Sequence, residues 1–164
     1  MKITRYMSLL TLILSFSLSQ ASLAQEFGLE YEYLFEIKAS LATPIEVGKT
    51  PLGRRTIFPI GGGVVEGPRI NGRVLPNGGD WLLRLNARTS KIDVRAVIET
   101  DEGDIIYSSY NGYIHTNNDG TLYFRANPVF ETSSKKYNYL NHTIAIGVGR
   151  FIDGGVAYSV YAIK

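Results

Sequence analysis

Short segments in which apolar and polar residues alternate are the strongest pattern in this chain, and they predict β-strands. From position 29 to 37 the odd-numbered residues are apolar or aromatic, and the even-numbered ones are charged apart from Leu34. A period of two places one set of side chains against a core and the other in water. The pattern predicts a strand that buries its odd-numbered residues and leaves Leu34 on the solvent side.

Similar patterns recur along the chain. Trp81, Leu83 and Leu85 form the apolar side of a second predicted strand, and the even-numbered residues from 92 to 98 form that of a third. Further strands are predicted over 105–110, 122–126, 144–151 and 156–163. Asp119-Gly120 and Asp153-Gly154 are typical hairpin turns. Because no segment has a sustained helical stripe, the sequence predicts an all-β, antiparallel sandwich or barrel, and we favour a single-domain, calycin-like β-barrel.

The glycine-rich stretch "GGGVVEGPRINGRVLPNGGDW", residues 61–81, has three possible interpretations. A phosphate-binding loop would lead into a helix, whereas Val64 and Val65 are strand formers. The stretch also lacks the Lys-Ser/Thr pair that ends a phosphate loop, and Glu66 stands where the dinucleotide-binding motif needs glycine. A flexible linker would not carry so many apolar residues among its glycines. We therefore predict bends in a curved sheet, with a close approach of a ligand to bare backbone as the alternative.

The first residues have the features of a cleavable signal peptide. Lys2 and Arg5 precede an apolar run over 7–18, and small residues lead up to Ala24. The alternative is a membrane anchor, but the run is shorter than the ~20 residues that a spanning helix needs. We predict a signal peptide over residues 1–24 and one barrel domain over 25–164, exported to the periplasm or secreted, with no membrane insertion after cleavage.

Composition narrows the classes of function. Removing 24 of the 164 residues takes both leader charges away, so the mature chain has a net charge of 2 − 2 = 0 and gives no case for a nucleic-acid partner. The absence of cysteine fits a bacterial periplasm better than a disulfide-stapled secreted scaffold. His115 and His142 are the two histidines, so a metal site is not expected.

Several motifs together resemble one known family. They are "GPRINGRVLPNGGDW", "IDVRAVIETDEGDIIY", "YFRANPVFET" and "YNYLNHTIAIGVG". In this order they resemble the domain-of-unknown-function family DUF3237, also called uncharacterised protein family UPF0311. The resemblance runs from about Tyr33 to Ile163 and implies an antiparallel β-barrel without a cofactor, but no defined activity. Ala96 and Ala126 depart from the residues that the family commonly has there.

Eight residues are candidates for a pocket at the barrel mouth. They are Asp80, Trp81, Asp93, Arg95, Glu99, Tyr107, Arg125 and Glu131. In this hypothesis Arg95 and Arg125 bind an anionic or enolate oxygen, and Trp81 stacks on a ring. The alternative for the charged residues is a solvated wall laced with ion pairs, and for Trp81 a place in the core or at a barrel end.

Three classes of function stay open from the sequence. The first is a binding module for a small aromatic or acidic molecule. The second is a cofactor-independent lyase, isomerase or cyclase, with Glu99 as the base, Arg125 as the oxyanion partner and Tyr107 as an acid; Glu131 or Asp93 could take the acid or base role instead. The third is a structural envelope protein without a ligand.

Overall fold

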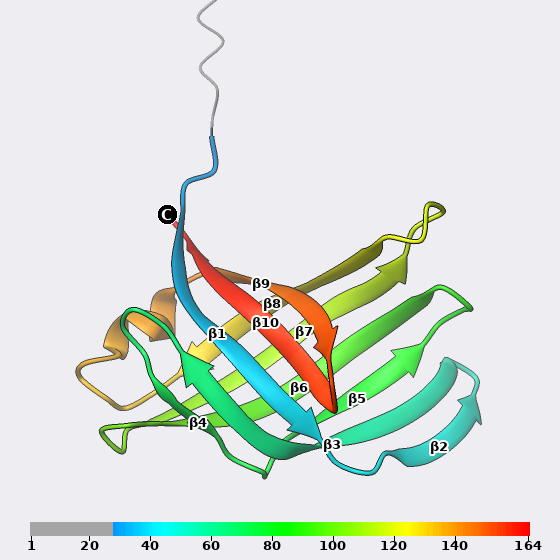
Figure 1. Ribbon diagram of the computed structural model, residues 1–164, viewed down its shortest axis with the longest axis horizontal. Coiled ribbons are helices and arrows are strands. Elements are labelled where there is room, and N and C mark those ends of the chain that lie inside the picture. Colours follow the sequence, from blue (N-terminus) through cyan, green and yellow to red (C-terminus); the bar gives the residue numbers. More distant parts are fainter. Residues whose placement is uncertain (1–27) are drawn as a thin grey trace, which may run out of the picture.

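The computed structural model describes residues 28–164, and all but one of its regular elements are strands (Figure 1). The strands are β1 (Tyr31–Leu41), β2 (Ile45–Thr50), β3 (Gly53–Glu66), β4 (Gly72–Val74), β5 (Gly79–Arg84), β6 (Thr89–Thr100), β7 (Ile105–Thr116), β8 (Leu122–Glu131), β9 (Ala145–Ile152) and β10 (Gly155–Ile163). One 3₁₀-helix, η1 (Asn138–His142), lies between β8 and β9.

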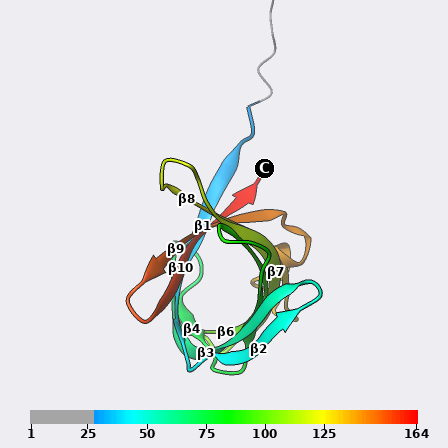
Figure 2. The same ribbon diagram turned by 90° about the vertical axis from the view of Figure 1, so that its right-hand side faces the viewer.

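The strands form one antiparallel sheet that closes on itself into a barrel (Figure 2). The order is β1-β10-β9-β8-β7-β6-β4-β3-β2, and an additional pairing of β1 with β3 closes the ring. Because β4 and β5 both lie between β3 and β6, and β2 pairs with β3 beside the ring, the closed barrel has eight strand positions. The predicted single-domain, all-β, antiparallel barrel is confirmed.

The glycine-rich stretch runs from the second half of β3 through β4 into β5, and its first glycines, Gly61 to Gly63, lie at a bend within β3, as predicted. The first half of β3 pairs with β2 and β5, and the second half pairs with β1 and β4. Gly62 has a φ of 121°, which side chains rarely adopt, at the place where the register with β1 shifts between Ser40 and Leu41. A Cβ on Gly63 would lie 2.1 Å from the carbonyl oxygen of Lys38. Glycine therefore allows one strand to change partners at a barrel corner.

The core fills the interior with alternate residues of each strand. In β6, Ile92, Val94, Ala96 and Ile98 are all at most 4% exposed, as the alternation predicts. Ala126 on β8 also faces inward, so both departures from the common family residues lie on the interior side.

The predicted facing of the side chains is wrong for the first half of β1. Leu34 is 1% exposed, whereas Tyr31 is 68% exposed. The register with β10 shifts between Tyr33 and Phe35, and this bulge turns both Leu34 and Phe35 into the core. A bulge adds one residue to a strand and so reverses the facing of the residues before it.

The two ends of the barrel differ. At one end, the segment 132–144 with η1 packs Tyr137 and Leu140 into the core, and the Tyr137 hydroxyl donates a 2.6 Å hydrogen bond to Glu102 in the β6–β7 turn. At the opposite end lie the β2–β3, β5–β6, β7–β8 and β9–β10 turns (Figure 1). We refer to this second end as the mouth.

The predicted signal peptide over residues 1–24 lies outside the described residues, so cleavage after Ala24 and export stay predictions. Within residues 28–164, no helix has the length and apolar character needed to cross a membrane.

Candidate functional site

An apolar cavity of about 100 Å³ lies inside the barrel on the side of the mouth. Its walls come from β1, β3, β5, β6, β7, β8, β9 and β10, and most of its lining residues are aliphatic or phenylalanine. Three residues of the lining carry a titratable group: Asp80, Tyr110 and Tyr158. A mostly apolar cavity with a few polar groups is the usual form of a small-molecule site.

Asp80 is the acidic member of this lining. It pairs with Phe58 on β3 and Val94 on β6, which both line the cavity. Its Oδ1 accepts a 3.0 Å hydrogen bond from the backbone N–H of Asp93. Burial raises the pKa of the Asp80 carboxyl from 3.8 to about 6; the hydrogen bond opposes this rise, and the charge of Asp93 adds to it. Asp80 can therefore exchange a proton near neutral pH.

Tyr110 and Tyr158 lie beside Asp80 and face each other from opposite walls. Their ring centroids are 5.4 Å apart in an edge-to-face arrangement, and Tyr158 makes the same kind of contact with Phe124 at 5.1 Å. Burial raises the pKa of both hydroxyls above the ordinary tyrosine value, and the nearby Asp80 charge raises each further. Both tyrosines therefore stay protonated at neutral pH and can donate hydrogen bonds.

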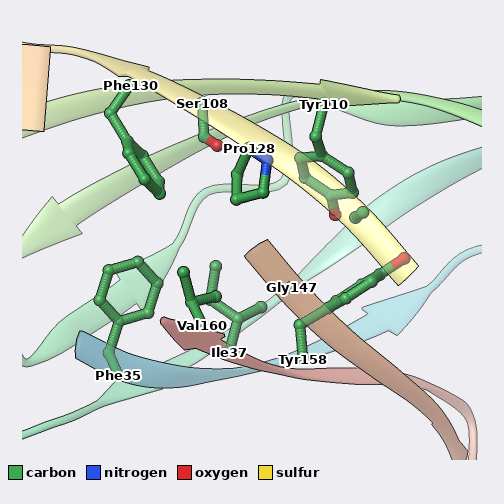
Figure 3. A pocket seen from close by; sticks show the side chains of 10 residues that line it. Phe35, Ile37, Ser108, Tyr110, Pro128, Phe130, Gly147, Tyr158 and Val160 are labelled. Carbon is green, nitrogen blue, oxygen red and sulfur yellow. The ribbon is translucent and has the colours of Figure 1, made fainter. Parts of the chain in front are cut away.

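A narrow slot lies on the other side of this tyrosine pair (Figure 3). Phe130, Pro128 and Ser108 line one wall, and Phe35, Ile37 and Val160 line the opposite wall. Its volume is about 10 Å³, which suffices for about one water molecule. The room for a ligand is thus on the side of the mouth, and the tyrosine pair marks the inner end of that space.

Of the predicted site residues, Asp80 lines the cavity, whereas Trp81, Asp93 and Arg95 form a cluster on the outer face of the barrel. Arg95 makes a 3.0 Å ion pair with Asp93, and its guanidinium lies 5.3 Å from the ring centroid of Trp81. Trp81 is 36% exposed, so its predicted place in the core is wrong. On β5, Asp80 and Leu82 face the cavity, opposite to the predicted facing, although Leu83 is buried at 9% exposed outside the cavity lining.

The other four predicted residues also lie on the outer face. Glu99 makes a 2.7 Å ion pair with Arg73. Tyr107 and Glu131 are cross-strand neighbours on β7 and β8. The Arg125 guanidinium lies 5.1 Å from the Tyr123 ring centroid and donates a 3.0 Å hydrogen bond to the backbone carbonyl of Phe124. The structure therefore does not bring Arg95, Glu99 and Arg125 together in the cavity.

Sequence reasoning missed Tyr110 and Tyr158 as lining residues. Tyr110 lies two residues from the inward-facing Ser108 on β7, and Tyr158 lies two residues from the inward-facing Val160 on β10. The period of two therefore placed both tyrosines on the interior face. This signal was hard to use, since the chain has eleven tyrosines and three of them, Tyr107, Tyr113 and Tyr161, lie on the outward face of the same two strands. Within residues 28–164, no group of three or more histidine, cysteine, aspartate or glutamate side chains could hold a metal ion.

The fold and the cavity together define a closed antiparallel β-barrel with an internal pocket that opens toward one end. A family described as "Protein of unknown function (DUF3237)" matches residues 29–163. The chain belongs to this family, also called UPF0311, and the resemblance inferred from the sequence motifs is confirmed.

Three relatives illustrate the similarity. A UPF0311 protein of Clostridium acetobutylicum is 32% identical over 150 residues, covering 83% of this chain and 95% of that protein. The crystal structure of a β-barrel-like protein from Acinetobacter baumannii has a TM-score of 0.81 at 34% identity, covering 84% of this chain and 97% of that one. A conserved protein of unknown function from Rhodopseudomonas palustris has a TM-score of 0.79 at 28% identity, covering 84% and 99%.

Proposed function

We propose that this protein binds a small, ring-bearing and largely apolar molecule inside the barrel, with a polar atom of the ligand against Asp80, Tyr110 and Tyr158. The observation that supports this most directly is the apolar cavity itself, in which these three residues are the titratable groups. The structural role without a ligand has less support, because the interior is not filled by side chains.

The lining suits a single aromatic ring. A cavity of about 100 Å³ approaches the roughly 150 Å³ of an engineered cavity that binds benzene. Phe58, Phe124 and Phe151 would contact a ring by edge or face, which adds to the gain from burying its apolar surface. The Tyr110 and Tyr158 hydroxyls hydrogen-bond each other, which leaves one hydroxyl to donate to a ligand oxygen, and ionised Asp80 would accept a hydrogen bond from a ligand hydroxyl.

A fluorescent probe without charge tests this proposal. N-phenyl-1-naphthylamine is expected to bind the purified protein, with its phenyl ring in the cavity and its emission enhanced. Val94→Phe should weaken binding at least tenfold, because Val94 is 3% exposed, lines the cavity and would fill it when enlarged. Fluorescence titration measures the Kd of each variant.

Val129→Phe is the matched control, since Val129 is 55% exposed on the outer face and the same side chain is introduced there. Circular dichroism checks that both variants are folded. If the probe does not bind, or binds folded Val94→Phe as tightly as the wild type, the proposed cavity site is wrong.

A second candidate function is cofactor-independent proton transfer. It is favoured by the pKa of Asp80, about 6, inside an otherwise apolar cavity. Asp80 would take the role of base that the sequence assigned to Glu99, and a tyrosine hydroxyl would stabilise the enolate oxygen that forms. The C–H proton of the ligand moves to the Asp80 carboxylate. The electron pair of that bond forms the C=C bond of the enolate, and the π pair of the carbonyl group moves to its oxygen.

Deuterium uptake tests this second function. Phenylacetone in deuterated buffer is expected to exchange its benzylic protons faster with the wild type than with Asp80→Asn, because asparagine cannot accept the proton. The rate should rise with pH and level off above about 6, as Asp80 ionises. Proton NMR follows the exchange. Equal rates for the two proteins at every pH would exclude Asp80 as a base for this probe and leave the binding proposal in place.

A further inference from the structure

A wide vestibule of about 470 Å³ lies at the mouth and adjoins the cavity. The two spaces share four lining residues, namely Phe58, Leu82, Ile114 and Phe151. A molecule that reaches Asp80 from the mouth therefore passes through the vestibule. Its chemistry differs from that of the cavity, because its lining includes three arginines, Arg54, Arg84 and Arg88.

Two of these arginines lie directly opposite each other. Arg54 on β3 and Arg84 on β5 are cross-strand partners, and both line the vestibule. Side chains at such positions have their Cβ atoms about 5 Å apart, and like charges there destabilise a sheet. The same two strands place Phe58 opposite Asp80 deeper in the barrel. The repulsion therefore occurs on the wall that leads to the cavity.

The vestibule lining contains one carboxylate, which offsets this positive charge incompletely. Glu46 is the acidic residue in the lining, and its carboxylate is 3.7 Å from the Arg54 guanidinium and accepts a 3.1 Å hydrogen bond from Thr56. Across residues 28–164, neither Arg84 nor Arg88 makes an ion pair. Arg88 is held instead by the neutral side chain of Asn118.

We infer that the ligand is an amphipathic organic anion: its ring enters the cavity, and its carboxylate, sulfonate or phosphate group is bound in the vestibule by Arg84 together with Arg54 and Arg88. The inference rests on the proposed function, whose binding site it extends. Guanidinium groups bind such oxygens through paired hydrogen bonds, and an anion between Arg54 and Arg84 would remove their repulsion.

The strand geometry also sets the approximate length of this ligand. Asp80, Leu82 and Arg84 follow one another on the same face of β5. Four residues along a strand span about 13 Å, and the long arginine side chain can shorten the gap between the charged groups. The ligand should therefore carry its anionic group about one ring beyond the part that lies in the cavity.

A matched pair of probes tests the inference. 8-Anilinonaphthalene-1-sulfonate has the ring system of N-phenyl-1-naphthylamine plus one sulfonate. In the double variant Arg54→Gln/Arg84→Gln, the Kd of the sulfonate probe should rise at least tenfold, whereas that of the uncharged probe should change less than twofold. With the wild type, added salt should weaken binding of the sulfonate probe alone.

Arg95→Gln is the control, because Arg95 lies on the outer face and its loss removes one arginine charge from outside the vestibule. It should leave both Kd values within twofold of the wild type. If the double variant binds both probes as the wild type does, while Val94→Phe weakens both, the anion site is wrong and the cavity site stands. If Val94→Phe weakens neither probe, the proposed function itself fails, and the anion inference fails with it.

Discussion

Asp80→Asn is expected to raise the free energy of unfolding by about 2–3 kcal/mol at about pH 7.5. The ionised carboxylate is disfavoured in the cavity, and a pKa that moves from 3.8 to about 6 corresponds to about 3 kcal/mol. Asparagine carries no charge, and its side-chain oxygen can still accept the hydrogen bond from the Asp93 backbone. Urea denaturation of the wild type and the variant measures the difference.

The pH dependence of this difference has a definite sign. The folded-state pKa of Asp80 is raised, so burying this carboxyl lowers stability only where it is ionised in the unfolded chain. Below about pH 3.8 the group is protonated in both states, and its burial costs no stability. The cost grows between pH 3.8 and about 6 and is complete above that range. The variant should therefore match the wild type at about pH 3.5 and exceed it increasingly up to neutral pH.

Asp101→Asn is the control for this experiment, since Asp101 is an exposed residue in the β6–β7 turn. Its effect should stay within about 0.5 kcal/mol at each pH. An Asp80→Asn variant that is less stable than the wild type at about pH 7.5, or equally stable throughout, would contradict the burial argument. A gain in stability would instead suggest that the cavity keeps a charged group for function at a cost to folding.

Phe35→Ala is expected to lower the free energy of unfolding by about 3–5 kcal/mol. Phe35 is 1% exposed, and its ring meets Phe130 edge-on across the barrel at a centroid distance of 5.9 Å. Removing a buried phenylalanine loses its transfer free energy and leaves a cavity that the surrounding strands cannot close. Denaturant unfolding followed by circular dichroism measures this change.

Val129→Ala is the comparison, because Val129 on β8 is 55% exposed on the outer face. It should change stability by no more than about 0.5 kcal/mol. If Phe35→Ala cost as little as this surface change, the bulge that turns Phe35 and Leu34 together into the core would be misplaced. The pair of variants thus checks the position of the barrel interior independently of any ligand.

The sequence predicted those parts of the fold in which local chemistry and tertiary packing agree. The even-numbered residues of β6 from 92 to 98 are apolar without interruption, so their alternation alone identified the buried face. Gly120 and Gly154 have positive φ in the predicted hairpins, because turn geometry is decided within a few residues. The cluster of glycines within β3 predicted the barrel corner for the same local reason.

The facing of β5 could not be predicted, because both of its faces contain apolar residues. Trp81 and Leu83 suggested the core side, yet Asp80, Leu82 and Arg84 line the interior spaces. An interior that contains an open cavity accepts charged groups, so hydropathy alone assigns such a strand to the wrong face. This single reversal moved Trp81 out of the site and brought Arg84 in.

Alternation and turn chemistry in the sequence determined the fold class and most strand positions, because these depend on near neighbours along the chain. The family was inferred from the resemblance of several sequence motifs. Tertiary structure alone decided which polar and charged residues meet. Closure of the ring brings Tyr110 and Tyr158 from distant strands to the cavity that Asp80 lines, and strand pairing sets Arg54 against Arg84. Since successive side chains in a strand point to opposite faces, register and bulges determine which of them line the site.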